Sequence, residues 1–258
     1  MRLCAHTITG PDLFAWTGLR STQFADLVSR LWDIHPDGRR GHLWALAFAD
    51  RLLLVALALR TNLTERQLAS LFSVSQVQVD RVVRDLTGPL GRLLGPPPRD
   101  RRDLWIVDGT LIPTRDHSRS AKSKNYRRST NVQVVCRRRD RRVIFVGHAW
   151  PGNRRDAVVF RETVPDEIVH HPRLIGDGGY QGVSGVGVPR RGPDGKMVRD
   201  LAWHRRRKRR ATVEHVLAEM KVYPVLRDCR RRGPGTNEVV WAVATLHSLR
   251  KESVVMVG

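Results

Sequence analysis

The chain has 258 residues, of which 41% are hydrophobic, and carries a formal net charge of +21. This length allows one large domain or two smaller ones, and the charge favours a polyanionic partner, DNA or RNA before a membrane surface. No apolar run reaches the roughly 18 residues of a membrane-spanning helix, and the amino-terminal sequence lacks the apolar core of a signal peptide. The three cysteines are far apart in the chain, so we expect a cytoplasmic protein with neither a zinc knuckle nor a disulfide framework.

Residues from about 21 to 94 are predicted to be helical. The stretches "TQFADLVSRLW" and "GHLWALAFADRLLLVALALR" carry apolar residues at helical spacing. The segment "GPPPRDRRD" follows, and its three consecutive prolines cannot continue a helix and favour an extended spacer. We therefore predict a helical domain over residues 1–95, a linker over 96–103 and a second domain over 104–258.

A helix-turn-helix pattern occupies "LTERQLASLFSVSQVQVDRVVRDL", residues 63–86. Thr64 is expected to cap the first helix, and Ser73-Val74-Ser75 to form the turn and cap the second. The inward-facing residues are then Leu68, Ala69, Phe72, Val79 and Val82. The residues expected to face a DNA groove are Ser75, Gln76, Gln78 and Arg81. An ordinary helical hairpin is the alternative, but the charge and the turn chemistry favour DNA binding.

The segment after the linker changes to short β-rich runs. They are "LWIVDG", "NVQVVCR", "RVIFVGHAW" and "RLIGDGGY". The first three follow one another closely, as neighbouring antiparallel strands would, and a helix at about 156–163 precedes the fourth. Two further helices are predicted at about 209–222 and 237–251. This order of strands and helices is an α/β pattern.

Two acids end apolar runs of this second domain: Asp108 follows the first run, and Asp177 follows the fourth, with Gly178-Gly179 behind it. Burying an unpaired carboxylate costs several kcal/mol, so such a group is either paired with a cation or holds a metal. For any single acid, a turn or a salt bridge is the more common explanation.

A third acid, Glu214, lies in the predicted helix at 209–222. On a helix, Arg210, Glu214 and Lys221 fall within roughly 40° of one another. Glu214 could therefore lean towards the strand ends, with Arg210 and Lys221 placed to hold phosphates. Three such acids can bind two divalent ions, and their oxygen ligands suit Mg²⁺ or Mn²⁺. A metal pair of this kind supports in-line phosphoryl displacement.

The ordered motifs "IVDGT", "GDGGYQG" and R-x-x-x-E-x-x-x-x-x-x-K, with "AWPGNRRDAVVF" between the first two, carry a resemblance over residues 63–223. The chain resembles DDE-type transposases of bacterial insertion sequences, of the branch whose catalytic domain is similar to Harbinger-type transposases. The resemblance implies an RNase H-like catalytic domain, a mixed sheet flanked by helices, preceded by an all-α helix-turn-helix domain. It also implies that Asp108, Asp177 and Glu214 are the catalytic, metal-binding triad. Asp156 is a secondary candidate, which could instead order a loop or a helix start.

Several other polar residues have two interpretations. In "AKSKNYRRS", Lys122, Lys124 and Arg127 could hold DNA, although a solvated charged loop is equally compatible. His204 and His215 lie near the expected site, but a catalytic role is not favoured for either. His170 and His171 are expected at the surface.

The function expected from these features is that of a nucleoid-associated DNA transposase that cleaves element ends and joins them to target DNA. Pairing two ends requires at least a dimer. One alternative is a DNA-binding regulator with a silent nuclease core. Another is a structure-selective nuclease of the same fold, which would cut junctions or hybrids but never join ends.

Overall fold

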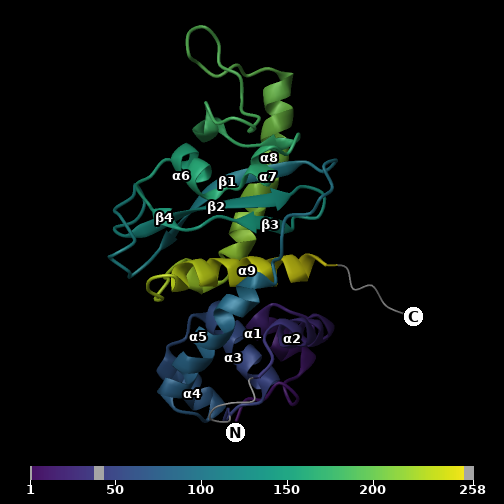
Figure 1. Cartoon of the computed structure of the whole chain (residues 1–258), viewed down its shortest axis with the longest axis vertical. Helices are drawn as coiled ribbons and strands as arrows, with labels where there is room; N and C mark the ends of the chain where they lie inside the picture. The colour runs from purple at the N-terminus through teal and green to yellow at the C-terminus, as the bar shows by residue number, and fades with distance from the viewer. Residues whose placement is uncertain (1, 38–43, 253–258) are drawn as a thin grey trace, which may run out of the picture. The chain divides into compact units, whose positions relative to one another are not determined.

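The computed structural model describes residues 2–37 and 44–252, which form two compact units. The helical unit contains the chain up to Leu94, residues Lys221–Asp228 and the chain from Pro234 onward; the catalytic unit contains Gly95–Met220 and Cys229–Gly233. Figure 1 colours the first helices of the helical unit purple and blue, and the sheet of the catalytic unit teal. Within the described ranges, no helix combines the length and the apolar character needed to cross a bilayer.

The helical unit is assembled around helix α3 (Phe48–Thr61), most of which is buried. Its elements are α1 (Gly10–Thr17), α2 (Ser21–Ile34), α3 (Phe48–Thr61), α4 (Glu65–Phe72), α5 (Gln76–Arg92), the 3₁₀ turn η2 (Pro224–Leu226) and α9 (Gly235–Lys251). Every residue of α3 from Leu52 to Leu57 is buried, as expected for a helix that is apolar on all sides. Helix α1 was not predicted, although Thr9 caps it by accepting from the Asp12 backbone N–H.

Helix α9 packs in the helical unit, whereas the predicted domain boundary placed it with the catalytic domain. The Gln23 side chain donates to the Leu249 carbonyl over 2.8 Å. A Cβ built on Gly91 of α5 would lie 2.8 Å from the Trp241 Cβ of α9, so these two helices approach closely. Most of α9 is buried, so it needs apolar partners on several sides, and the other helices of this unit supply them.

The helix-turn-helix forms as predicted. Thr64 and Ser75 each make a capping box with the glutamine three residues later, at the starts of α4 and α5. Ser73 ends α4 in the left-handed conformation, with φ 51°, a position where glycine is more usual. All five residues predicted to face inward are buried. The capping residues therefore account for where α4 begins and ends and for where α5 begins.

The catalytic unit contains a mixed sheet with the predicted strands. Its elements are β1 (Trp105–Pro113), β2 (Ser129–Arg137), β3 (Val143–Val146), β4 (Trp150–Pro151), α6 (Asp156–Thr163), α7 (Asp166–Val169), β5 (Leu174–Ile175), the 3₁₀ turn η1 (Gly178–Tyr180) and α8 (Leu201–Met220). The strand order is β3-β2-β1-β5, with β4 also pairing with β2. Strands β1, β2 and β3 are antiparallel neighbours, and β5 is parallel to β1. This arrangement has the RNase H-like character expected.

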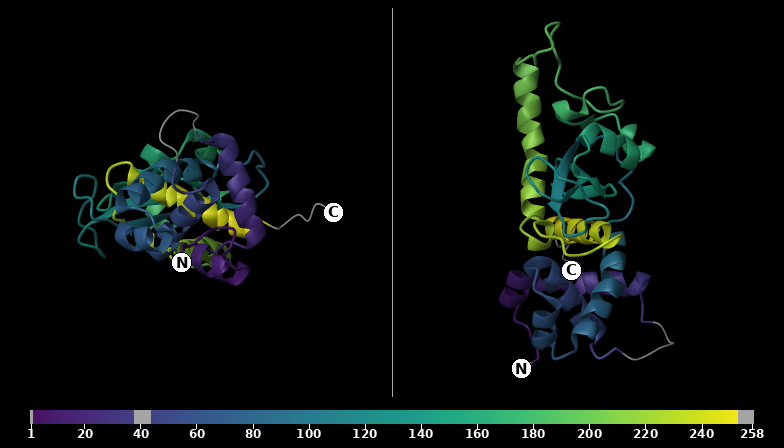
Figure 2. Two further views of the ribbon diagram at one scale, coloured as in Figure 1. Left: turned by 90° about the horizontal axis from the view of Figure 1, so that it is seen from below. Right: turned by 90° about the vertical axis from the view of Figure 1, so that its left-hand side faces the viewer.

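Helices cover both faces of this sheet, with α8 and α6 on opposite sides in the right-hand view of Figure 2. Side chains alternate across a strand. Val107 of β1 and Val135 of β2 join the core that includes Phe160 of α6. Asp108, the next residue along β1, therefore faces the side of α8. The alternation explains how one strand contributes both to the hydrophobic core and to a polar site.

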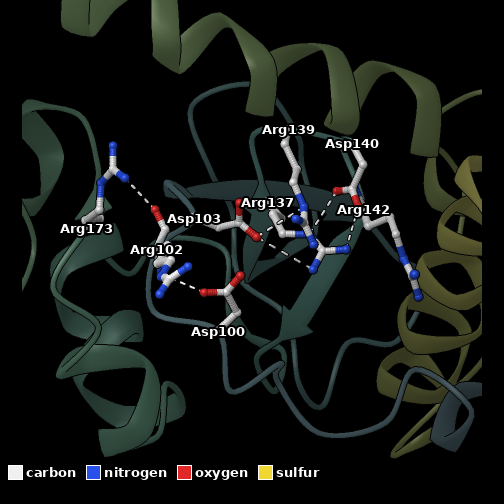
Figure 3. Close-up of polar contacts among 8 residues, drawn as sticks. All are labelled: Asp100, Arg102, Asp103, Arg137, Arg139, Asp140, Arg142 and Arg173. Atoms are coloured by element: carbon white, nitrogen blue, oxygen red, sulfur yellow. Dashed lines mark hydrogen bonds and ion pairs between the residues drawn. The ribbon is translucent and has the colours of Figure 1, made fainter.

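Charged side chains fasten the linker to the end of β2, as Figure 3 shows. Asp103 lies 3.2 Å from Nε of Arg139 and 3.8 Å from Nη1 of Arg137, which also pairs with Asp140. Arg137 is only 8% exposed. Part of the arginine-rich run at 137–142 is thus paired within the unit.

Candidate active site

Asp108 and Asp177 lie at equivalent points of two adjacent parallel strands. In the register of β1 and β5, Ile106 is paired with Ile175. Each acid follows two residues after its member of this pair. Parallel strands run in the same direction, so the two acids lie at the same level of the sheet. Asp177 follows the end of β5, whereas Asp108 lies within β1 and not at its end as predicted.

The electrostatics of Asp108 reflect this clustering. Its side chain is 19% exposed. Burial raises the pKa of Asp108 to about 7; the nearby guanidinium of Arg210 opposes the shift, and the carboxylates of Asp177 and Asp156 add to it. A carboxylate surrounded by other carboxylates is destabilised in its charged form, and a bound cation would relieve that repulsion.

Asp177 is held in place by the turn that follows β5. Its side chain accepts from the Gly179 backbone N–H over 2.7 Å, which caps η1. The glycine pair predicted to turn beside this acid supplies that donor. The local sequence therefore fixes one oxygen of Asp177.

Helix α8 contributes Arg210 and Glu214. The Nη2 atom of Arg210 lies 3.6 Å from Asp108 Oδ2 and 3.7 Å from Glu214 Oε1, so the guanidinium stands between these two acids. The Glu214 side chain is 62% exposed. The charge of Asp177 raises the pKa of Asp108. Glu214 is linked to Asp108 only through Arg210, which lies within ion-pair distance of both acids.

Asp156, at the start of α6, is a further acid of the cluster that contains Asp108 and Asp177. At the start of α6, its Oδ1 accepts from Asn131 Nδ2 over 2.8 Å and from Gln133 Nε2 over 3.1 Å. It also contributes to the pKa of Asp108. Asp156 therefore both begins a helix, as the simpler interpretation suggested, and adds charge to the site.

Asp156 is held by polar side chains that were not predicted from the sequence. Tyr180 is buried, and its hydroxyl donates to Gln133 Oε1, while Gln133 Nε2 reaches Asp156. Burial raises the pKa of Tyr180 well above its usual value, with the carboxylates of Asp108, Asp156 and Asp177 contributing. Asn131 and Gln133 alternate with valines in "NVQVV", and this polar alternation on a buried strand was the available signal.

The acids of this site are the right ligand type for a divalent metal, but their oxygens are not close enough together to hold one in this conformation. The acids supply hard oxygen donors, and burial, with added repulsion from Asp177 and Asp156, raises the pKa of Asp108. Across the part of the chain that the structure describes, however, the only three His, Cys, Asp or Glu ligand atoms within 4.8 Å of one another belong to Cys4, His6 and Asp50. The acids of the predicted triad are therefore more widely spaced in this conformation.

The predicted DNA contacts of the catalytic domain fall into two groups. Lys122, Lys124 and Arg127 are exposed between β1 and β2. Lys221 does not share a helical stripe with Arg210 and Glu214, because α8 ends at Met220 and Lys221 belongs to the helical unit. The chain leaves the helix there to bury Tyr223, whose hydroxyl donates to the Thr17 carbonyl over 3.1 Å.

The four predicted groove-facing residues of the helix-turn-helix are all exposed. The side chains of Ser75 and Gln78 bond to each other in the capping box. Gln76 Nε2 donates to Glu65 over 3.3 Å. Val77 was not predicted to face a groove, but it is 76% exposed on the same turn.

Arg81 is oriented by an aromatic ring. Its guanidinium lies 4.3 Å from the centre of the Trp44 ring, and the guanidinium of Arg51 lies 4.4 Å from that centre. Arg51 is fully buried and pairs with Asp37 and Asp85. This stack links the exposed arginine of α5 to a fixed group in the core of the unit.

One of the four histidines considered, His171, lies in surroundings other than those predicted. His204 and His215 are exposed on α8. His170 is exposed, but the expectation that His171 lies at the surface was wrong, because it is 4% exposed and stacks on Trp105 with ring centres 3.7 Å apart. Trp105 begins β1, and the stack covers its ring.

Comparison with known proteins agrees with this arrangement of a helix-turn-helix and an acidic site. Residues 44–94 match the helix-turn-helix of DDE superfamily endonucleases, and residues 107–248 match the DDE superfamily endonuclease family itself. The second match covers more than half of the chain. The chain therefore belongs to the DDE superfamily endonucleases, whose members generally use divalent metal ions.

A relative identifies the kind of DDE enzyme more closely. The chain is 42% identical over 253 residues to a protein of Streptomyces albus G named as a transposase for insertion sequence element IS112, covering 94% of this chain and 96% of that protein. This chain thus belongs to the DDE-type transposase family of insertion sequences, with an amino-terminal helix-turn-helix. No solved structure matches it.

Proposed function

We propose that this protein binds the ends of its insertion sequence, cleaves them by hydrolysis and joins the freed 3′-hydroxyls to target DNA. The observation that supports this most strongly is the alignment of Asp108 with Asp177 across β1 and β5. Arg210 of α8 approaches Asp108, and Glu214 of the same helix lies on the other side of that guanidinium. Together they form an acidic site of the kind that phosphoryl transfer requires.

In this proposal, Asp108, Asp177 and Glu214 hold two Mg²⁺ or Mn²⁺ ions. When bound, such ions lower the pKa of an attacking water or hydroxyl and stabilise the departing oxygen. Arg210 now stands between Asp108 and Glu214, so it must move from this position for the acids to close. Its guanidinium would then bind a phosphate of the DNA, because planar bidentate recognition suits that partner.

The DNA-binding residues divide into two proposed roles. Gln76 and Arg81 read bases, and Ser75 and Gln78 fix the start of the recognition helix through their capping box. Lys122, Lys124, Arg127 and Lys221 hold the phosphate backbone without reading sequence. We also propose that two copies assemble on DNA, because two element ends must be paired.

The test is incubation of the purified protein with DNA carrying its own element ends and Mg²⁺, with products mapped at nucleotide resolution. Wild type should nick at the element ends and join them. Asp108→Asn should bind the same DNA with unchanged affinity and leave it uncut. Glu167→Gln, an exposed acid of α7, is the matched control and should cut normally.

Three outcomes would reject the proposal. Cleavage that persists in Asp108→Asn would show that Asp108 is not a metal ligand for this reaction. Binding without cleavage by the wild type in any divalent metal indicates the regulator. Cleavage of junctions or hybrids with no joining of ends indicates the structure-selective nuclease.

A further inference from the structure

Three side chains of different chemistry meet at the beginning of the helical unit. Sγ of Cys4, a ring nitrogen of His6 and a carboxylate oxygen of Asp50 all lie within 4.8 Å of one another. Cys4 is half-buried, His6 is exposed and Asp50 is 6% exposed. Thiolate, imidazole and carboxylate are the ligand types that zinc uses in proteins.

The backbone presents these three groups to one another. The Thr7 and Ile8 N–H groups both donate to the Cys4 carbonyl, over 3.3 and 3.2 Å. This tight turn carries both Cys4 and His6. The Ala5 N–H, between them, donates to Asp50 Oδ1 over 2.6 Å, which ties the turn to α3 beside the carboxylate.

The geometry requires only a small contraction to bind an ion. The usual zinc–ligand lengths imply ligand atoms about 3.3–3.7 Å apart around a tetrahedral centre. Rotation of the exposed His6 and the half-buried Cys4 side chains can close the difference. Arg2 lies 3.8 Å from Asp50 and also donates to the Ala45 carbonyl, so its guanidinium has a second partner to retain when a cation binds.

We propose that Cys4, His6 and Asp50 form a zinc site with three protein ligands and one water. Binding forms a zinc–sulfur bond, and the thiol proton of Cys4 passes to solvent. The sulfur and imidazole ligands select zinc over magnesium. This site is therefore chemically distinct from the acidic site of the catalytic unit, and its existence does not depend on the proposed transposition reaction.

The ion would fasten the segment from Arg2 to Ile8 to the DNA-reading part of the chain. The Leu3 N–H donates to the Leu71 carbonyl over 3.0 Å, and Leu71 lies in α4, the first helix of the helix-turn-helix. Zinc at Asp50 would hold the other side of this segment on α3. Its role is thus structural, and removing it should lower the melting temperature of the helical unit.

The experiment titrates the metal-free, full-length protein with Co²⁺ as a spectroscopic substitute for zinc. We expect one equivalent to give a near-ultraviolet thiolate-to-cobalt charge-transfer band and the intense visible bands of four-coordinate cobalt. Zn²⁺ should abolish both, and Mg²⁺ should not. Cys4→Ser should lose the charge-transfer band, and His6→Ala should weaken Co²⁺ binding by at least about tenfold.

His117→Ala is the matched control, because it removes an exposed histidine of the catalytic unit and should titrate as wild type does. Cobalt held by oxygen ligands alone gives no thiolate charge transfer, so the acidic site cannot imitate the signal. Absence of the band in wild type, its persistence in Cys4→Ser, or unchanged affinity in His6→Ala would overturn the proposal. Circular dichroism checks folding, and His6 is exposed enough that its loss should leave the fold intact.

Discussion

The backbone of Gly109 lies directly against the carboxylate of Asp156. A Cβ at Gly109 would come within 1.9 Å of Asp156 Oδ1 and 2.9 Å of Gln133 Nε2. Gly109 is the residue after Asp108, on the strand face opposite to it. Because Gly109 has no side chain, α6 can place the Asp156 carboxylate against β1 on one face of the sheet. There it raises the pKa of Asp108, which faces the other side.

Gly109→Ala should therefore abolish strand cleavage and destabilise the protein by about 1–3 kcal/mol, because the added methyl must displace Asp156 or bend β1. Cleavage assays and urea unfolding measure the two effects. Gly178→Ala is the control at the same site, since its Cβ would meet only Met197 Cε at 3.6 Å. Equal behaviour of the two variants would contradict this account of Gly109.

Gln133→Leu should destabilise the protein by about 1–3 kcal/mol, because it leaves the buried Tyr180 hydroxyl without its partner and removes one of the hydrogen bonds to Asp156. Adding Tyr180→Phe should recover part of the loss, since the unpaired hydroxyl is then gone. A double-mutant cycle by urea unfolding measures the coupling. Strictly additive effects would show that the hydrogen bond contributes nothing to stability.

Trp44→Ala should weaken binding to element-end DNA by about two- to fivefold, because the stack that orients Arg81 is worth about 0.5–1 kcal/mol at an exposed site. Fluorescence anisotropy at fixed salt provides the measurement. In Arg81→Ala, the further change Trp44→Ala should have little effect on binding. Trp203→Ala, in the catalytic unit, is the control for loss of a tryptophan. If Trp44→Ala weakens DNA binding as much in Arg81→Ala as it does in wild type, Trp44 does not act through Arg81.

Acid should destabilise the catalytic unit through His171. Burial lowers the pKa of His171 below its ordinary 6.5, and Nδ1 accepts from the Arg173 N–H, as a neutral ring does. The unfolded chain therefore binds the proton more readily. The stability supplied by neutral His171 is complete above about pH 6.5 and declines as the pH falls through the folded-state pKa.

His171→Phe keeps an aromatic ring on Trp105 and removes the titration. Between pH 7 and 5 its urea midpoint should fall less than that of wild type. His170→Ala, at the exposed neighbouring position, should follow the wild-type pH profile. If His171→Phe and wild type lose stability in parallel, other groups account for the acid sensitivity.

Local patterns in the sequence were sufficient for much of this protein. The capping residues Thr64 and Ser75 act over three residues, and the runs that become β1, β2 and β3 are short and rich in β-branched residues. The order of the three acidic motifs indicated the family, and the matches confirm that family. Such features can be predicted from the sequence because their physical causes, hydrogen bonding at helix ends and side-chain periodicity, operate between near neighbours in the chain.

Tertiary structure decided what depends on contacts between distant residues. The placement of α9 in the helical unit, the packing of Asp156 on Gly109, the burial of His171 on Trp105 and the meeting of Cys4 and His6 with Asp50 each join segments separated in the chain. Spacing and composition carry no measure of those distances, because strand register and helix packing set them only once the whole core has formed.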